Sequence, residues 1–462
     1  MLPLLAALAL PAVARAQAPD SEPARSVTDS AAAPPASGAL AVTSVTVIDV
    51  ATGAAEPERT VLIRDGRIEA VVSTDVPLPD DIEVFDAGGG FVIPGLWDAH
   101  VHLSFATESA LPVLVANGVT TVRDLGSDLA EIDGWRAEIA AGSRVGPRIL
   151  RAGPTLNGES FNAYQTVTDG PDRARATVRR LARAGVDVIK VHRRVPRDDY
   201  FAIVDEANAN GLPVVGHIPM TVRPEEASDA GQWIEHTETL FEGVFSDGLG
   251  IVELPDSIRG FRSPDGGGAE ALFARFVRND TPVTPVLGAW RYLVQHPDTS
   301  VLADPRIRYV ARSLREDARE SPLITSEQLP IVERLVAEYG AVVRMMARSD
   351  VALLTGTDLA TAWQAPGFSL HDELAALVDV GASPLQALRA ATLEPARLHG
   401  MDDELGCIEP GMAADLVILD ADPLDDIAHT RRIAAVVVGG EVLDREALDA
   451  LLRRGERLAE RN

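Results

Sequence analysis

The chain has 462 residues, which is more than one simple core needs and suits one large domain with a smaller satellite. Hydrophobic residues make up 46% and charged residues 24%, as is typical of a soluble globular protein. A formal net charge of −27 argues against nucleic-acid binding because phosphates would be repelled, and the single Cys407 rules out an intramolecular disulfide framework.

Residues 1–18 form an apolar run that ends in small residues, with a plausible cleavage site at Ala16-Gln17-Ala18. This pattern predicts a signal peptide and therefore a secreted or periplasmic protein, because the run is too short for a transmembrane helix. An uncleaved anchor is the alternative. Residues 19–39 are rich in Pro, Ala and Ser and are expected to form a disordered linker.

The two ends of the remaining chain are rich in β-branched residues. Segments 40–92 and 405–445 are expected to pair into one small domain, a β-sandwich, and 446–462 to form a C-terminal helix. Within the first segment, Arg64-Asp65-Gly66-Arg67 carries the Asp-Gly signal of a tight β-hairpin.

Residues 93–404 alternate short β-rich runs with helical stretches, which indicates parallel βαβ units. Eight such runs predict a (β/α)8 barrel of the TIM type. They lie at 92–103, 118–126, 147–154, 185–192, 212–218, 232–238, 281–287 and 351–358. The long connections 239–281 and 288–350 are expected to carry extra helices over the mouth of this barrel.

Polar residues at the carboxyl ends of barrel strands are the candidates for chemistry, because active sites of this fold lie there. The first strand ends in His100 and His102, whose spacing places both imidazoles on one face of a strand. Later strands end in further candidate metal ligands, namely Lys190, His217, His236 and Asp358. Each residue alone has a structural explanation, but their joint occurrence in barrel order predicts a metal site.

Lys190 is the only lysine of the chain, and the other 41 of its 42 basic residues are arginine. A lysine retained alone is a candidate for chemistry that arginine cannot perform, since arginine stays protonated. Burial would favour the neutral amine, which can react with carbon dioxide to give an anionic carbamate, N6-carboxylysine. The alternative is a lysine that reaches to the barrel rim.

At this point the sequence resembles the amidohydrolase superfamily, from Leu40 to about Asp444. The resemblance is carried by the segment Pro94-Gly95-Leu96-Trp97-Asp98-Ala99-His100-Val101-His102, by His371-Asp372-Glu373-Leu374, and by the runs 384–398 and 411–424. It is closest to the imidazolonepropionase-like and prolidase-like proteins, in a binuclear branch with a carboxylated lysine.

This resemblance implies two divalent metal ions, with zinc as the expected element. His100, His102 and Asp358 would hold one ion and His217 and His236 the other. Carboxylated Lys190 would bridge both ions.

The expected activity is metal-dependent hydrolysis of an amide bond in a dipeptide or N-acyl amino acid by a metal-bridging hydroxide. Asp358 is the expected general base. Two alternatives remain open: the same site acting on a lactone, cyclic amide or organophosphate ester, or an inactive binding protein.

A small-molecule substrate is expected, with no nucleic acid and no membrane contact after signal removal, and a homo-oligomer is compatible with the sequence. A substrate carboxylate could be received by an arginine after the fourth strand. The candidate substrate contacts are Tyr164, His192, Arg193, Arg194, Tyr200, Arg291 and His371. For His371 a helix-capping role is the alternative.

Overall fold

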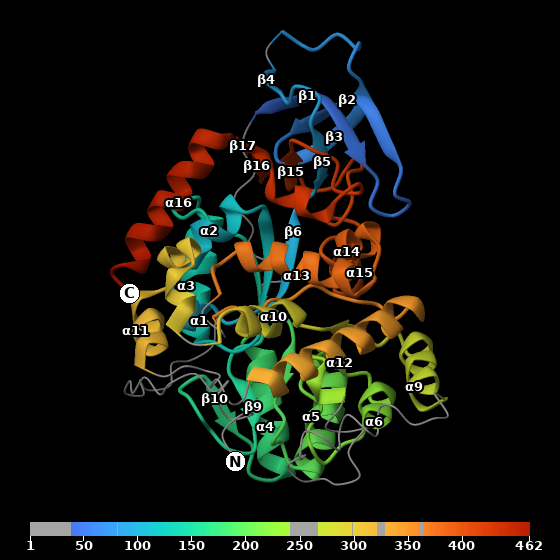
Figure 1. Cartoon of the computed structure of the whole chain (residues 1–462), viewed down its shortest axis with the longest axis vertical. Helices are drawn as coiled ribbons and strands as arrows, with labels where there is room; N and C mark the ends of the chain where they lie inside the picture. The colour runs from blue at the N-terminus through green and yellow to red at the C-terminus, as the bar shows by residue number, and fades with distance from the viewer. Residues whose placement is uncertain (1–37, 81, 241–266, 298, 321–328, 361–363) are drawn as a thin grey trace.

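The structure is a computed structural model that describes residues 38–80, 82–240, 267–297, 299–320, 329–360 and 364–462. Figure 1 shows two parts along the long axis, a β-sheet at one end and a larger α/β body below it. The expected signal segment 1–18 and nearly all of the expected linker 19–39 lie outside the described residues.

Strands from both ends of the chain share one eight-stranded sheet. The sheet has the order β17-β16-β15-β5-β1-β2-β3, with β4 beside β1. Its members are β1 Ala39–Ile48, β2 Ala55–Arg64, β3 Arg67–Ser73, β4 Glu83–Asp86, β5 Phe91–Pro94, β15 Leu416–Leu419, β16 Ile433–Val438 and β17 Glu441–Leu443. The antiparallel pairing of β5 with β15 joins the two ends, as expected. The β-sandwich arrangement stays a prediction.

The predicted hairpin joins β2 and β3. Asp65 and Gly66 have φ angles of 49° and 74°, so both central residues are left-handed, as a type I′ turn requires. Arg64 and Arg67 face each other across this turn. The Asp-Gly prediction is confirmed.

The α/β body contains two sheets of parallel strands. One holds β6 Leu96–Val101, β7 Val119–Asp124 and β8 Arg148–Arg151. The other has the order β10-β9-β11-β12-β13-β14, with β9 Thr155–Asn157, β10 Gln165–Val167, β11 Ile189–Val191, β12 Val214–Gly216, β13 Trp233–Glu235 and β14 Val283–Thr284. Seven of the eight expected runs therefore contain a strand, and the eighth is represented by an isolated bridge at Leu353.

Backbone hydrogen bonds continue beyond the edges of both sheets. The amide of Val283 donates to the carbonyl of Ala352 at 2.9 Å, and the amide of Ala99 in β6 donates to Thr355 at 2.9 Å. On the opposite side, Asp187 ahead of β11 donates to Arg151 of β8 at 2.9 Å. The segment around 351–358 thus lies between β14 and β6.

The run expected as one strand at 92–103 is divided at Gly95. β5 ends at Pro94 and belongs to the eight-stranded sheet, whereas β6 begins at Leu96 in the α/β body. A Cβ on Gly95 would lie 2.0 Å from Oγ1 of Thr120, so only glycine fits where the chain passes from one part to the other. The sheet therefore extends slightly beyond the boundary expected at residue 93.

The helices lie around the parallel strands, on both sides of the body in the view of Figure 1. They are α1 Leu103–Ala106, α2 Ala110–Ala116, α3 Leu129–Ala140, α4 Pro171–Arg183, α5 Arg197–Ala209, α6 Pro224–Asp229, α9 Gly267–Arg278, α10 Leu287–Gln295, α11 Arg312–Glu320, α12 Leu329–Arg348, α13 Phe368–Val380, α14 Pro384–Ala390, α15 Leu393–Leu398 and α16 Arg445–Ala459. Short 3-10 turns lie at η1 Thr299–Ala303, η2 Pro305–Tyr309 and η4 Ile427–Arg431. Both long connections contain helices, and the stretch 241–266 of the first lies outside the described residues.

The helical run 384–398 is two helices rather than one. The side chain of Ser383 caps α14 by accepting a hydrogen bond from the amide of Gln386. The side chain of Gln386 in turn accepts a hydrogen bond from the amide of Ser383, which completes a capping box. The break before α15 is explained by Pro395, whose ring would clash with the carbonyl of Ala391 in a continuous helix.

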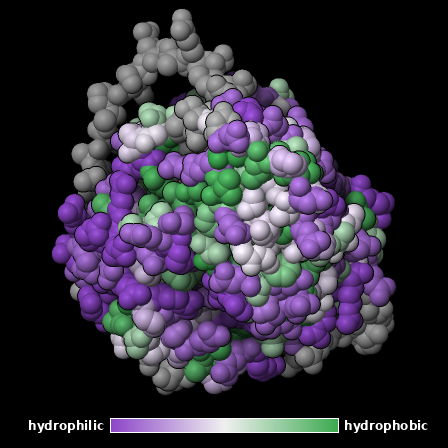
Figure 2. All heavy atoms as spheres, turned by 90° about the horizontal axis from the view of Figure 1, so that it is seen from above, coloured by the Kyte–Doolittle hydropathy of each residue, from purple (hydrophilic) through white to green (hydrophobic). Residues whose placement is uncertain are grey.

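The surface seen from the sheet end is mostly hydrophilic, with an apolar area near its centre (Figure 2). Among the described residues, the large apolar side chains that are well exposed are Val76, Val84 and Val277. None of the described helices combines the length and the apolar character needed to cross a bilayer.

Candidate metal centre

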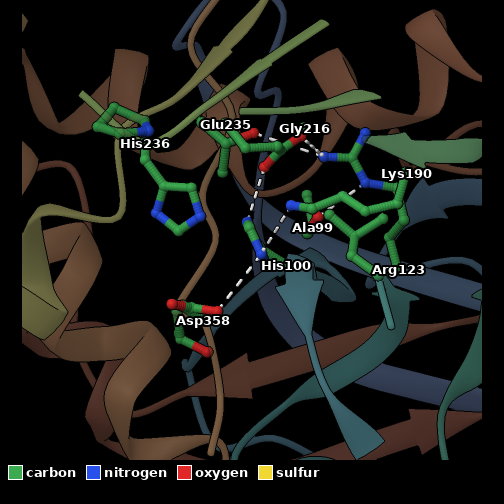
Figure 3. A network of polar contacts seen from close by, with 12 residues as sticks. Ala99, His100, Arg123, Lys190, Gly216, Glu235, His236 and Asp358 are labelled. Atoms are coloured by element: carbon green, nitrogen blue, oxygen red, sulfur yellow. Dashed lines mark hydrogen bonds and ion pairs between the residues drawn. The ribbon is translucent and has the colours of Figure 1, made fainter. Parts of the chain in front are cut away.

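The predicted ligands come from strand ends that meet at one place. His100 lies in β6 and Lys190 in β11, while His217 and His236 follow directly after β12 and β13. Asp358 belongs to the segment between β14 and β6, where its amide donates to the carbonyl of His100 at 2.8 Å. Figure 3 shows His100 between Asp358 and Lys190, with His236 close by.

His100 is the centre of the first group. Its Nε2 lies 3.3 Å from Nζ of Lys190 and 3.4 Å from Oδ1 of Asp358. The same carboxylate oxygen lies 3.0 Å from Nε2 of His102. All of these side chains except His102 are buried, and the His102 side chain keeps 16% exposure.

His217 and His236 form the second group. Their ring centroids are 4.2 Å apart, and the ring of His236 is 4.7 Å from that of His100. Possible ligand atoms of His217, His236 and Glu238 lie within 4.8 Å of one another, and so do those of His100, His236 and Asp358. His236 therefore belongs to both clusters and connects the two halves of the site.

The backbone is strained at two of these residues. His236 and Asp358 have φ angles of 70° and 55°, a left-handed conformation that residues other than glycine rarely adopt. Successive residues of a regular strand point to opposite faces, whereas the turn at His236 lets both Glu235 and His236 point into the site (Figure 3). Strain of this kind concentrates at functional sites.

Burial is the main influence on the pKa of the Lys190 amine. It lowers the pKa of Lys190 to about 8, against the opposing effect of the Glu235 and Asp358 carboxylates. The pKa of Asp98 is raised by burial to about 7, although hydrogen bonds from Thr357 and from the His100 amide act in the other direction. The neutral form of the Lys190 amine is therefore much more accessible near physiological pH than that of an exposed lysine.

The donor set fits divalent metal ions. Imidazole nitrogens and carboxylate oxygens are the ligands that zinc and related metals use. Nδ1 of His217 is buried and has no hydrogen-bond partner within the described residues, which is the condition expected of a ligand atom. Such an unsatisfied nitrogen is expensive unless another group binds it.

Three of the predicted substrate contacts lie beside this centre, and a fourth, Arg194, is exposed next to them in the chain. The half-buried ring of His192 is 4.4 Å from the ring of His217, and burial followed by the charge of Arg193 holds its pKa well below the usual range. Arg193 is 8% exposed, whereas its neighbour Arg194 is exposed and paired with Glu159. Tyr164 packs edge-on against Phe105 at 4.6 Å, and Phe105 in turn lies beside His102.

Three other residues predicted as substrate contacts, Tyr200, Arg291 and His371, lie elsewhere, so this prediction is wrong for them. Tyr200 is fully buried on α5, where its hydroxyl donates to the side chain of Gln232 at 2.8 Å. Arg291 on α10 pairs with Asp379 at the surface at 2.8 Å.

His371 is buried on α13, and its two ring nitrogens face Oγ1 of Thr430 at 3.0 Å and the carbonyl of Asn117 at 3.1 Å. Tyr200 and His371 are thus engaged within the core and Arg291 in a surface ion pair, so none of the three lies at the metal centre.

Several buried charged residues at the site were not predicted. Glu235 and Arg123 form an ion pair beneath His100, Asp98 accepts from Thr357, and Glu238 lies 3.5 Å from Nδ1 of His236. The available signal was a charged residue inside an apolar strand, as in the runs 118–126 and 232–238.

The fold and the ligand cluster define a metal-dependent hydrolase. The model of the amidohydrolase family matches residues 91–443, and the chain belongs to this family. The family assignment agrees with the resemblance found in the sequence.

The chain is also similar to individual members of this family whose sequences are known. The chain is 27% identical over 379 residues to an imidazolonepropionase of Symbiobacterium thermophilum, covering 77% of this chain and 82% of that protein. It is 26% identical to adenine deaminase 2 of Agrobacterium fabrum, covering 87% of this chain but only 57% of the relative's length.

The fold of the chain is similar to that of solved amidohydrolase structures. A putative prolidase from Bifidobacterium longum matches with a TM-score of 0.66 and 27% identity, covering 90% of this chain and 99% of the other. The bottromycin amidohydrolase matches with a TM-score of 0.70 and 27% identity, covering 91% and 90%. These neighbours imply a fold of the TIM-barrel type, and the protein is a hydrolase that acts on C–N bonds in the imidazolonepropionase-like and prolidase-like branch.

Proposed function

We propose that the protein hydrolyses the amide bond of a dipeptide or an N-acyl amino acid, using two divalent metal ions, most suitably zinc, bridged by carboxylated Lys190. The observation that carries this proposal is the position of the only lysine. Its Nζ lies 3.3 Å from Nε2 of His100, in the middle of the ligand cluster. A protonated amine at this place would repel metal ions, whereas an anionic carbamate would attract them.

Carboxylation follows from the surroundings of the amine. Lys190 is 2% exposed, and burial favours its neutral form. The lone pair of the neutral amine attacks carbon dioxide, a C–N bond forms, and one proton leaves to water. The product carries one negative charge on two oxygens, which gives one ligand atom to each side of the site.

The remaining ligands divide into two groups. His100, His102 and Asp358 would hold one ion, and His217 and His236 the other. Bound divalent ions would acidify a water molecule and polarise the scissile carbonyl. In this arrangement a free oxygen of Asp358 would take a proton from the attacking water and pass it to the leaving nitrogen.

The substrate class is suggested by Arg193. This arginine is buried and directly follows His192, and its charge adds to the effect of burial, which is the main cause of the lowered pKa of both His192 and His217, so it lies close to the ligands. A guanidinium pairs well with a carboxylate, which a dipeptide or an N-acyl amino acid offers and a lactone or phosphate triester does not. The similarity to a structure described as a putative prolidase supports the same class.

A substrate panel tests this proposal. The metal-loaded full chain should hydrolyse dipeptides or N-acyl amino acids with a free carboxylate, and their C-terminally amidated analogues should react poorly. Arg193→Met should lower kcat/KM for the free acids by about 10-fold to 100-fold, the value of a charged hydrogen bond, and leave the amidated analogues unchanged. Arg194→Met is the matched control. Equal rates for free and amidated substrates, or a preference for lactones or organophosphates, would refute the proposed substrate class.

Further proposals on the fold, the export and the assembly of the protein accompany this function. The hydrogen bonds around 351–358 and the similar solved structures support closure of the strands into an eight-stranded barrel. A cleaved signal after Ala18 and export remain proposals, which the mass of the exported protein tests. The β-sandwich arrangement of the small domain is a further proposal, which an experimental structure tests. A homo-oligomer is another, which the mass of the protein in solution tests.

A further inference from the structure

Two charged side chains that the proposed reaction does not use lie at the base of the metal centre. Arg123 on β7 and Glu235 on β13 are both fully buried, and Nη2 of Arg123 pairs with Oε1 of Glu235 (Figure 3). Nε of Arg123 also donates to the carbonyl of Ala99 in β6 at 2.7 Å. The guanidinium therefore connects three strands and fixes the place of the Glu235 carboxylate.

The second oxygen of this carboxylate faces the metal centre. Oε2 of Glu235 lies 2.9 Å from Nδ1 of His100. The first oxygen is held by the Arg123 guanidinium, and a carboxyl group placed between a guanidinium and an imidazole nitrogen is stabilised as the carboxylate.

An ionised carboxylate can only accept hydrogen bonds. The proton of the neutral His100 ring must then be on Nδ1. Nε2 consequently keeps its lone pair, and this is the nitrogen that faces Lys190 and Asp358.

We propose that Glu235, held by Arg123, is a positioning residue that fixes the tautomer and orientation of His100 so that Nε2 is offered to a metal ion. The inference rests on the proposed role of His100 as a ligand. A carboxylate on the far nitrogen of a liganding imidazole also increases the basicity of the near nitrogen.

Stability alone is a weak explanation for this ion pair. Removing two charges from water is costly, and well-packed apolar residues are often as stable as a buried pair or more so. The pair is therefore better explained by what it does to His100. His236 has a looser counterpart, since Oε1 of Glu238 is 3.5 Å from its Nδ1.

The first test is the zinc affinity of the full-length Glu235→Gln protein, measured by competition with a chelator. A side-chain amide can turn and donate, so it no longer dictates the tautomer. We expect an affinity weakened by about 10-fold to 100-fold. Glu373→Gln is the matched control, because Glu373 is an equally buried acid that accepts from the backbone of Leu287 and Gly288 and has no hydrogen bond or ion pair with the predicted ligands among the described contacts. It should bind zinc as tightly as the wild type.

A second variant covers the case in which Glu235→Gln does not fold because Arg123 is left unpaired. The double variant Arg123→Met/Glu235→Gln contains no unpaired buried charge and should fold with the same loss of zinc affinity. Wild-type affinity in either folded variant would overturn the inference.

The tautomer itself can be read in the metal-free wild type by nitrogen NMR of labelled histidine, with His100→Asn for assignment. We expect the proton on Nδ1, and a proton on Nε2 would overturn the inference. None of these readouts involves a substrate, so a failure here leaves the proposed substrate class standing, and a wrong substrate class leaves this inference standing.

Discussion

His371 gives a prediction whose size can be derived from the structure. Its ring is 1% exposed, and Nε2 donates to the carbonyl of Asn117. Burial, followed by the charge of Arg431, lowers the pKa of His371 from 6.5 to about 4. The folded protein therefore accepts this proton less readily than the unfolded chain does.

The sign of the effect follows from proton linkage. As the pH falls below 6.5, His371 becomes protonated in the unfolded state, whereas in the folded state it stays neutral until about pH 4. The free energy of unfolding therefore decreases as the pH falls through this window. The difference in pKa corresponds to a total of about 3 kcal/mol, of which about 2 kcal/mol is lost between roughly pH 7 and pH 4.5.

The perturbation is His371→Gln, which removes the titrating group and keeps hydrogen-bonding capacity. Urea denaturation of chelator-treated wild type and variant should show that the wild type loses about 2 kcal/mol more than the variant between roughly pH 7 and pH 4.5. The variant should keep the wild-type kcat/KM near neutral pH, because His371 lies within the fold. An equal pH dependence in the two proteins, or a large loss of activity in a stable variant, would refute this reasoning.

Three further outcomes are expected. Lys190→Arg should bind less than the full complement of metal and lose nearly all turnover, because arginine cannot be carboxylated; metal analysis with full content and normal rates would contradict this. Gly216→Ala should destabilise the protein by about 1–3 kcal/mol, because the new Cβ would lie 2.1 Å from a backbone oxygen of β11. Gly231→Ala, also at positive φ but with open space, should be milder in thermal denaturation, and equal losses would count against the steric explanation. Tyr200→Phe should lose about 1–3 kcal/mol because Gln232 is left unsatisfied, with kcat/KM unchanged; a raised KM would restore Tyr200 as a substrate contact.

Much of the architecture could be predicted because it follows from local patterns. The alternation of β-rich and helical runs indicated the parallel strands, and the Asp65-Gly66 pair indicated the hairpin. The division at Gly95 was missed although Pro94-Gly95 is a turn signal within the run 92–103, because this local signal does not show that the strands on its two sides belong to different sheets. The close approach of Thr120 in the folded chain shows why a glycine stands at this division.

The candidate site shows a similar division. The ligand types and their order predicted a metal centre because each residue stands at the end of a strand-like run. Tyr200 and His371 were misassigned because a polar side chain near such a run can equally satisfy a buried hydrogen bond. Glu235 was missed because its role depends on Arg123 and His100, which are distant in sequence and become neighbours only in the folded chain.

The central claim is that Lys190 is carboxylated when metal is bound. Because the chain has one lysine, carbon NMR of the metal-loaded protein equilibrated with isotopically labelled carbon dioxide can show a side-chain carbamate from one residue only. We expect one carbamate signal that is absent from the Lys190→Arg variant, which also controls for the α-amino group. An active, metal-loaded protein without this signal would contradict the account.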